Sequence, residues 1–353
     1  MSVLTSRARP VAPGTTTPPQ VWHVGRRGEV AGGMTQVVNA YLDWPFEHVD
    51  VRLLPTRNGG MGPAALALML AAAVRMPFLG RRDRTVVAVH LSQGGSFIRE
   101  GLLLRWASCL GYGTTAHLHG STFVDFAQRS PALVAKTLRR ADVVVALSQI
   151  TIAEVTRLAP DTRVEFVQNA VPAGAPSSKE RLVVFAGAVT RRKGVDVLLE
   201  AWRRRDPANG WTLHVAGPAV EPELLDDLPA NVVIAGSLPH SELMSLLDRS
   251  AVAVLPSRDE AMPMFILEAL ARRNAVISTT VGGIPGVLGG GAGVMVSPGD
   301  VDAFAAALDA VTADPEGLEQ TAAAGHARYV SEYAAATVYP RVEELWLSTL
   351  RGA

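Results

Sequence analysis

The sequence predicts an α/β protein in which two doubly wound, parallel-sheet domains face a central cleft. Three observations support this prediction. The chain has 353 residues, which is long for one hydrophobic core and favours two domains. Short runs of β-branched residues alternate with longer helical stretches, as in parallel sheets covered by helices on both faces. The alternation stops at VPAGAPSSKE (171–180) and then restarts, so this stretch is interpreted as an interdomain linker.

The first half of the chain contains the strands predicted for one sheet. Their apolar runs lie at 21–25, 49–55, 85–91, 114–120, 142–148 and 163–169. Helices are expected to open at Gly32, to cover residues 64–75 and to reach about residue 110 after the third strand. Residues 1–20 form no apolar stretch and are expected to be a disordered leader. Residues 21–170 are then the first domain.

The second half repeats the same alternation. Its predicted strands lie at 181–187, 211–217, 231–237, 251–257 and 274–280. Helices are expected from residue 193, near 239–249, near 263–272 and from about 315 onward. In the last segment, 335–353, Trp346 and Leu350 provide an apolar side that is expected to pack back onto the first domain. Residues 171–334 are then the second domain.

The composition excludes several classes of function. The chain has 33 Lys+Arg and 33 Asp+Glu, so it lacks the overall positive field expected of a nucleic-acid-binding protein. Its single cysteine, Cys109, excludes an intramolecular disulfide framework and any multi-cysteine metal or iron–sulfur site. A reducing, cytoplasmic setting fits. The longest apolar run, 64–74, is shorter than the roughly 20 residues that span a bilayer.

Charge is distributed unevenly along the chain. Residues 1–170 hold 18 Lys+Arg and 11 Asp+Glu, whereas residues 171–353 hold 15 and 22. The basic half could face an anionic surface, but a general preference for arginine explains the same excess. The segment RMPFLGRRDR (75–84) combines arginines with apolar side chains and also allows two interpretations. Its arginines beside apolar side chains fit peripheral contact with an anionic membrane, and they equally fit an ordinary helix-to-strand loop.

Two glutamates near a strand end are the most specific feature of the sequence. Glu260 lies in the loop after a buried strand, and Glu268 lies in the following helix. The first carboxylate can accept hydrogen bonds from sugar hydroxyls, and the second can hold a ribose diol. Between them, the backbone amides of Met262, Met264 and Phe265 with the positive helix end form a phosphate site. Alternatively, Glu260 is a helix cap and Glu268 a solvated helix residue.

The stretch DEAMPMFILEALARRNAVIST (259–279) resembles the motif of two glutamates with seven residues between them in retaining GT-B glycosyltransferases of family 4, the glycosyl transferases group 1. Further pieces follow in the family's order, namely AHLHG, VVALS, VQNAV, VFAGAVTRRKGVDVLLEAW and TTVGGIPGVL. The resemblance runs from about residue 21 to the end. It implies the GT-B fold, in which a nucleotide sugar binds between two Rossmann-like domains, and a hexosyltransferase that works without a metal.

The resemblance places cations and glycines around the leaving group. Lys193, at a strand-to-helix turn, would neutralise the diphosphate, although it could be a solvated helix-start lysine. Family members usually carry an arginine after the glycine that corresponds to Gly187, where this chain has Ala188. The site therefore has one cation fewer unless Arg191 or Arg192 reaches in. Gly217 and Gly236 end strands that, by resemblance, border the nucleotide.

The resemblance also places His119 at the cleft near the transferred sugar, opposite Glu260. The alternative is a buried histidine bonded to a backbone carbonyl. His117 and His90 are interpreted as structural. Gly32 and Gly33 open the first helix and would let the backbone approach a phosphate or the acceptor, although a tight turn also explains such a pair.

Two further segments resemble known motifs, but the first match is incomplete and the second has another explanation. The loop with Gly282 and Gly283 is interpreted as a turn facing phosphate and sugar, although Gly286 stands where the family commonly has glutamate. Asp300 and Asp302 match an Asp-x-Asp metal motif, but they precede a helical run. Asp300 is therefore interpreted as an N-cap, with Asp302 in the first turn, and no metal is predicted.

The resemblance implies a retaining transfer of sugar from a nucleoside diphosphate sugar, the donor substrate, to a hydroxyl acceptor, with no other cofactor. The acceptor could be a glycan, a lipid-linked intermediate or a small molecule, as in the biosynthesis of exopolysaccharide, capsule or another glycoconjugate. The expected location is cytoplasmic, with a peripheral position at the inner face of the cell membrane left open. A nucleotide-sugar epimerase of the same fold and a non-catalytic nucleotide- or glycan-binding subunit remain alternatives.

Overall fold

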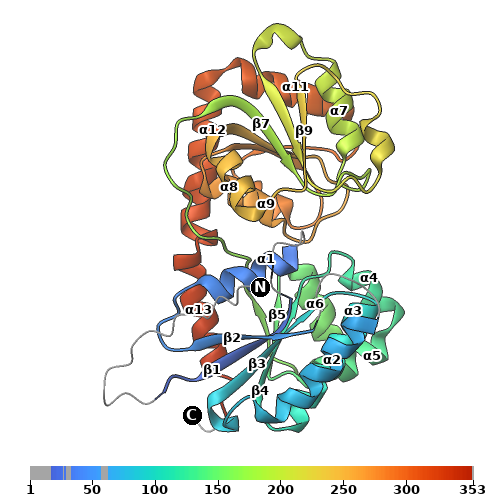
Figure 1. Cartoon of the computed structure of the whole chain (residues 1–353), viewed down its shortest axis with the longest axis vertical. Coiled ribbons are helices and arrows are strands. Elements are labelled where there is room, and N and C mark those ends of the chain that lie inside the picture. The colour runs from blue at the N-terminus through green and yellow to red at the C-terminus, as the bar shows by residue number, and fades with distance from the viewer. Residues whose placement is uncertain (1–16, 27, 29–32, 57–62, 352–353) are drawn as a thin grey trace.

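The computed structural model describes residues 17–26, 28, 33–56 and 63–351. Most of the predicted leader and Gly32 lie outside these residues. The described chain forms two lobes, one above the other, and a long C-terminal helical segment runs beside both (Figure 1). Within the described residues, no helix combines the length and the apolar character needed to cross a bilayer.

The first lobe is built on a six-stranded sheet with all neighbouring strands parallel. Its strands are β1 (Gln20–Gly25), β2 (Asp50–Pro55), β3 (Thr85–Leu91), β4 (Gly113–Leu118), β5 (Val143–Ala146) and β6 (Val164–Phe166), in the order β2-β1-β3-β4-β5-β6. Its helices are α1 (Gly33–Asp43), α2 (Pro63–Arg75), α3 (Gly95–Cys109), α4 (Phe123–Arg129), α5 (Pro131–Leu138) and α6 (Gln149–Leu158). All seven residues of β3 are buried, which fits the apolar run VVAV at 86–89 within it.

The second lobe repeats this plan. Its strands are β7 (Glu180–Ala186), β8 (Thr212–Ala216), β9 (Val232–Gly236), β10 (Ser250–Leu255), β11 (Ala275–Thr279) and β12 (Val294–Val296), in the order β12-β11-β10-β7-β8-β9. Its helices are α7 (Val195–Arg203), α8 (His240–Arg249), α9 (Met264–Ala271), α10 (Ile284–Leu288), α11 (Val301–Ala313) and α12 (Pro315–Arg328). All neighbouring strands are again parallel.

Each sheet has one point where the strand order reverses. In the first sheet this switch lies between β1 and β3, and in the second between β7 and β10. Loops after the two strands at a switch diverge to opposite faces, and they leave a crevice where doubly wound proteins bind ligands. A ligand site is therefore expected at the loops after β1, β3, β7 and β10.

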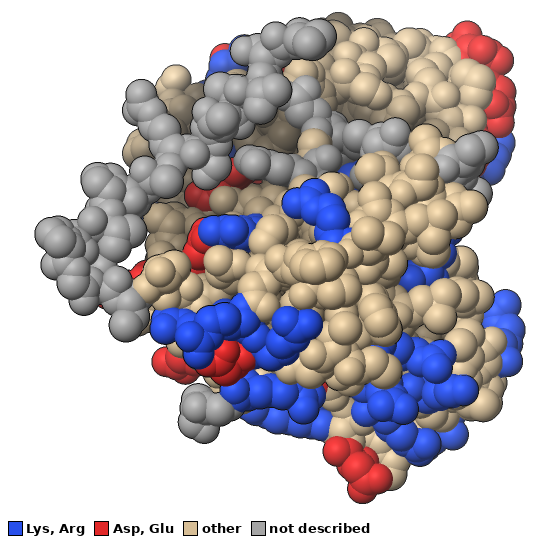
Figure 2. Space-filling model, turned by 60° about the horizontal axis from the view of Figure 1, so that its bottom comes forward, with Lys and Arg blue, Asp and Glu red and all other residues tan. Residues whose placement is uncertain are grey.

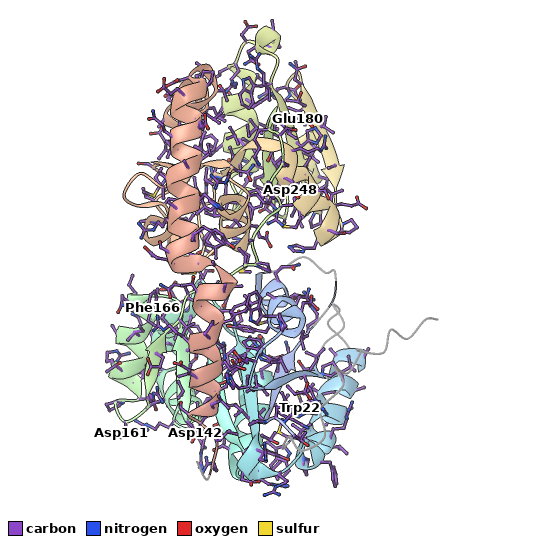
Figure 3. The ribbon with its side chains drawn as sticks, turned by 90° about the vertical axis from the view of Figure 1, so that its left-hand side faces the viewer. Trp22, Asp142, Asp161, Phe166, Glu180 and Asp248 are labelled. Atoms are coloured by element: carbon purple, nitrogen blue, oxygen red, sulfur yellow. The ribbon has the colours of Figure 1, made fainter. Side chains whose placement is uncertain are left out.

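The C-terminal segment connects the second lobe back to the first. After α12 comes a π-helical turn (Tyr329–Tyr333) and then α13 (Ala335–Leu347). Trp346 is fully buried against His23, with ring centroids 5.0 Å apart. Glu343 accepts hydrogen bonds from the backbone N–H groups of His48 and Val49 at 2.6 and 3.0 Å. These contacts place α13 on the first lobe (Figure 3).

The Asp-x-Asp segment caps a helix. The backbone N–H of Ala303 donates to Asp300 Oδ1 at 2.9 Å, and Asp300 is the N-cap of α11. Asp302 lies in the first turn and forms an ion pair with Arg204. The capping interpretation of Asp300 is confirmed.

Candidate active site

Lys193 and Glu260 meet at the switch point of the second sheet. Lys193 lies in the turn after β7, and Glu260 lies in the loop after the neighbouring strand β10. Lys193 Nζ donates a hydrogen bond to Glu260 Oε1, and Ser257 Oγ donates to the same oxygen at 2.8 Å. The Glu260 side chain is 9% exposed and that of Lys193 17%. The switch point thus holds a nearly buried carboxylate and ammonium.

Glycines hold this pair in place from two directions. Gly282 has φ +55°, and a Cβ there would overlap the carbonyl oxygen of Glu260. Gly194 follows Lys193 with φ +74°, and a Cβ there would overlap the carbonyl oxygen of Pro256. Both positions need glycine because the backbone is left-handed and a second backbone lies against it. The structure packs the turn around Gly282 against the Glu260 loop, and its expected position facing phosphate and sugar stays a prediction.

Glu268 lies in a cleft between the lobes. It is buried on α9, and its Oε1 lies 2.8 Å from His240 Nε2 at the start of α8. This hydrogen bond raises the pKa of His240. Both residues line a cleft of about 400 Å³, together with Gln36 and Asn39 from the first lobe. The alternative of a solvated Glu268 is wrong, and so is a capping role for Glu260, because the N-cap of α9 is Pro263.

The starts of two helices meet at the gap between the lobes. Met264 begins α9, and its side chain approaches the first residue of α1, Gly33, since a Cβ on Gly33 would lie 3.9 Å from Met264 Cγ. Figure 1 shows α1 and α9 facing each other. The amides of Met264 and Phe265 belong to the first turn, where no helical carbonyl precedes them. Met262 is fixed from the first lobe, because Asn169 Nδ2 donates to its carbonyl oxygen at 3.3 Å. Two positive helix ends thus converge on the gap.

His119 belongs to a chain of histidines rather than bonding to a backbone carbonyl. His119 Nε2 lies 2.8 Å from His90 Nδ1, and His90 Nε2 lies 2.7 Å from His23 Nδ1. Each contact needs one donor and one acceptor, so the tautomers of the three rings are coupled. Burial lowers the pKa of His119 to about 4 and that of His23 to about 3. Near pH 7 His119 is therefore a neutral imidazole with a fixed orientation.

A contact between the lobes brings His119 and Glu260 to the same gap. Ser121, two residues after His119, donates from its Oγ to Asp259 Oδ2 at 2.9 Å, and Asp259 immediately precedes Glu260. Arg192 also reaches this loop, with its Nη1 donating to the carbonyl oxygen of Asp259 at 3.1 Å. Of the two arginines considered as substitutes for the missing cation, Arg192 is thus at the gap.

Arg191 points elsewhere. Its Nη1 lies 3.7 Å from Asp196 Oδ2, and its backbone N–H donates to Glu221. Sequence patterns did not identify Ser121, Asp259 or His240. The available signal was that each lies just beyond the carboxyl end of a strand or at the start of a helix that follows one.

The three strand-end glycines lie side by side. Gly187, Gly217 and Gly236 close the neighbouring strands β7, β8 and β9. The N–H of Gly187 donates to the Ala216 carbonyl at 2.9 Å, and that of Gly217 donates to Gly236 at 2.7 Å. The three glycines thus form a surface of backbone without side chains, and Gly187 lies next to the Lys193 side chain. Their expected role at the nucleotide stays a prediction.

Three histidines are close enough to be considered as metal ligands. His90, His117 and His119 each offer a ring nitrogen, and these nitrogens lie within 4.8 Å of one another. Both nitrogens of His90 are already occupied by histidine neighbours. A divalent ion there would break these bonds, and the cluster contains no carboxylate to offset its charge. The residues fit a neutral hydrogen-bonded chain better than a metal site, and the absence of a metal stays a prediction.

Two parallel-sheet lobes, with helices around each sheet, are the architecture of the GT-B fold. Residues 180–314, in the second lobe, match the family Glycosyl transferases group 1. The chain is 32% identical over 178 residues to a glycogen synthase of Mycobacterium tuberculosis, which covers 48% of this chain and 43% of that protein. It is 31% identical over 189 residues to a D-inositol 3-phosphate glycosyltransferase of Thermobifida fusca, which covers 49% and 43%. The match thus spans less than half of these curated relatives.

Solved structures cover almost the whole chain. Sucrose-phosphate synthase from Thermosynechococcus elongatus superposes with a TM-score of 0.69 at 17% identity over 93% of this chain and 98% of that one. HepE of Anabaena in complex with UDP-glucose gives 0.70 at 14% over 94% and 100%. The predicted GT-B fold is confirmed.

Proposed function

We propose that this protein is a retaining glycosyltransferase that moves a sugar from a nucleoside diphosphate sugar to a hydroxyl acceptor without a bound metal. The observation that carries the proposal is the Lys193–Glu260 pair at the switch point of the second lobe, opposite His119. The group 1 match covers this lobe. HepE, which shares the fold, is described in complex with UDP-glucose. The nucleoside and the sugar of the donor are left open.

The charges of the site suit the bond that breaks. Cleavage of the bond between the anomeric carbon and phosphate leaves negative charge on the diphosphate and positive charge on the sugar ring. Lys193 and the starts of α1 and α9 stabilise the first charge, and the Glu260 carboxylate holds the donor-sugar hydroxyls beside the second. Glu268 receives the ribose hydroxyls. Because the lysine has three N–H donors, it can keep its bond to Glu260 while it binds a phosphate oxygen.

The first lobe supplies a neutral surface for the sugar. Ser121 contacts Asp259, and the segment 119–121 to which it belongs contains no carboxylate. The first-lobe carboxylate that lines the cleft, Asp43, lies there with His240 and Glu268. The composition of segment 119–121 favours a front-face route over a covalent glycosyl-enzyme. The bond from the acceptor oxygen to the anomeric carbon forms as the bond to phosphate breaks, and the acceptor proton passes to the departing phosphate oxygen. His119 then positions a sugar hydroxyl through a fixed neutral ring.

The acceptor belongs to a glycan, a lipid-linked intermediate or a small metabolite, within exopolysaccharide, capsule or other glycoconjugate biosynthesis. A cytoplasmic location is proposed from the single cysteine.

Donor binding and turnover test the proposal. Thermal-shift measurements with nucleoside diphosphates and their sugars should show a rise in Tm, because these ligands bind only the folded chain. Release of nucleoside diphosphate is then compared between wild type, Glu260→Gln and the surface control Glu319→Gln. Wild type and the control should release it, Glu260→Gln should not, and the product should keep the anomeric configuration of the donor. A chain that binds nucleotide but never turns over would favour a binding subunit, and release of a free epimerised sugar would favour an epimerase.

A further inference from the structure

Helix α2 exposes apolar side chains with no polar residue among them. Its sequence, PAALALMLAAAVR, contains no polar side chain before Arg75. Leu66, Leu70 and Val74 follow one another at intervals of four and are 53%, 55% and 69% exposed. Phe78, just beyond the helix, is 83% exposed. An ordinary surface helix turns charged or polar residues to water on this side, so the exposed side of α2 is adapted to another environment.

Helix α3 continues the same surface. Its exposed apolar residues, Ile98, Leu102 and Trp106, also recur every four positions. Trp106 Nε1 donates a hydrogen bond to the carbonyl oxygen of Ala73 at 3.1 Å, which joins the two helices. Together with Leu66, Leu70, Val74 and Phe78, these three residues are called the apolar face. It gathers seven of the twelve large hydrophobic side chains that are exposed in the described chain, so these side chains form a cluster.

Arginines flank the apolar face. Arg75 ends α2, and Arg99 and Arg105 lie on α3. Among the ion pairs of the described residues, none involves these three arginines. The one glutamate of α3, Glu100, is buried beneath the surface. Viewed from below, the first lobe shows many more basic than acidic side chains (Figure 2).

We propose that the apolar face binds the surface of an anionic lipid bilayer. Apolar side chains enter the boundary between headgroups and acyl chains, while arginines attract the lipid phosphates. A second copy of this chain fits less well, because a symmetric contact through this face would set arginines against arginines. The segment 75–84 contributes Arg75 and Phe78 to the face, whereas Arg81 is paired with Asp83 at 2.7 Å.

The topology places the first part of the apolar face toward the cleft. In a parallel sheet with crossover helices, each helix begins near the carboxyl edge of the strand before it. Helices α2 and α3 follow β2 and β3, so they begin at the edge of the sheet that faces the second lobe. Leu66 and Ile98, near the starts of these helices, therefore lie toward the cleft, whereas Val74 and Phe78 lie toward the opposite edge of the sheet. Membrane binding does not depend on the proposed function, but together they favour an acceptor carried in the membrane.

Vesicle flotation with the full chain tests the proposal. The vesicles contain either phosphatidylcholine alone or phosphatidylcholine with phosphatidylglycerol. Wild type should float with the anionic vesicles, much less with the neutral ones, and less again at high salt. Arg75→Gln/Arg99→Gln/Arg105→Gln should lower partitioning about fivefold for each arginine. Leu70→Ser/Phe78→Ser should lower it on the order of tenfold.

Matched controls keep the result interpretable. Ile150→Ser/Val330→Ser removes two exposed apolar side chains outside the apolar face and should float like wild type. Circular dichroism melting checks that each variant folds. The proposal is overturned if wild type stays unbound, if neutral vesicles retain it equally, if the variants of the face still float, or if sedimentation shows a dimer that the same variants dissociate. Nucleoside diphosphate binding, measured without vesicles, tests the proposed glycosyltransferase separately.

Discussion

The two lobes share one architecture but build their sides of the gap from opposite chemistry. The second lobe presents ionised groups, with Lys193 bonded to Glu260 at its switch point and Glu268 beside His240. Beside Glu260, the first lobe presents a chain of neutral histidines that ends at the partly exposed His119, and its carboxylate at the cleft is Asp43, near His240. The difference corresponds to the two substrates proposed. A diphosphate needs fixed opposite charge, whereas a hydroxyl acceptor needs oriented but uncharged partners.

The two halves of the sequence also differ in net charge. The first half of the chain carries 18 Lys+Arg against 11 Asp+Glu, and the second carries 15 against 22. The apolar face lies on the first lobe, whereas the group 1 family match lies in the second. The second lobe thus carries the part of the sequence that identifies a family, and the first lobe carries the exposed apolar surface.

The largest effect is expected from breaking the charged pair. Lys193→Ala should lower donor turnover by about 10²–10³-fold, because it removes a cation from the developing diphosphate. It also leaves Glu260 nearly buried without its partner, so the free energy of unfolding should fall by about 3 kcal/mol. Steady-state kinetics and chemical denaturation measure the two effects. The exposed Lys136→Ala serves as the control, and a Lys193→Ala enzyme with wild-type turnover would refute the assignment.

The next effect concerns the backbone behind Glu260. Gly282→Ala should destabilise the fold by about 2 kcal/mol and lower turnover, because a Cβ would push on the Glu260 carbonyl from a left-handed backbone. Gly286→Ala is the matched control, since a Cβ there meets nothing within 4 Å. Melting temperature and turnover are compared for the pair. Equal behaviour of the two variants would show that Gly282 does not position the glutamate.

Acid should destabilise the first lobe, which holds the buried histidines, more than the second. Burial lowers the pKa of His23 and His119 to about 3 and 4, and also lowers the pKa of His90 and His117. Below pH 6.5 the unfolded chain takes up protons that these folded rings do not. Each of the first two should therefore cost about 1.4 kcal/mol of unfolding free energy per pH unit between pH 6.5 and its folded pKa.

Denaturation between pH 7.5 and 5 measures this dependence. His240 acts in the opposite sense, because Glu268 raises its pKa and its contribution is lost as the pH rises. The buried histidines are more numerous and should dominate. Stability that is flat or rises toward pH 5 would contradict neutral burial of the histidine chain.

The smallest effect is expected at the cleft. His240→Gln removes a half-exposed partner of Glu268 and should weaken nucleoside diphosphate binding a few-fold, with kcat nearly unchanged. Isothermal titration and kinetics separate the two quantities. A large loss of kcat with unchanged affinity would move His240 from nucleotide binding to the chemical step.

Most strands could be predicted because they are continuous apolar runs buried on both faces. The edge strand β12 was missed, since three residues after a glycine-rich stretch give no pattern. Helices α4 and α5 were missed because each has at most eight residues, which is too short for a clear helical period. Gly33 fits the expected helix opening, but its neighbour Gly32 lies outside the described residues.

Within the site, Glu260 and Glu268 could be placed because they lie on one strand–loop–helix unit. Their partners could not be predicted so directly. His240 comes from a helix 28 residues earlier, and Ser121 meets Asp259 across 138 residues. The hydrogen bonds of His119 depend on the register of β1, β3 and β4, which place His90 beside His117 and one strand away from His23. These contacts depend on the order of the strands in the sheet, which a short sequence motif does not determine.

The chain passes between the lobes twice, once from Phe166 in β6 to Glu180 in β7 and once from α12 to α13 (Figure 3). The two connecting segments are hydrogen-bonded to each other. Val171 N–H donates to the Tyr333 carbonyl at 3.2 Å, and Ala335 N–H donates to the Val171 carbonyl at 2.9 Å. These hydrogen bonds join the two connecting segments at one edge of the interface between the lobes. A change in the width of the cleft would therefore have to be a rotation about this edge, since both connections are tied there.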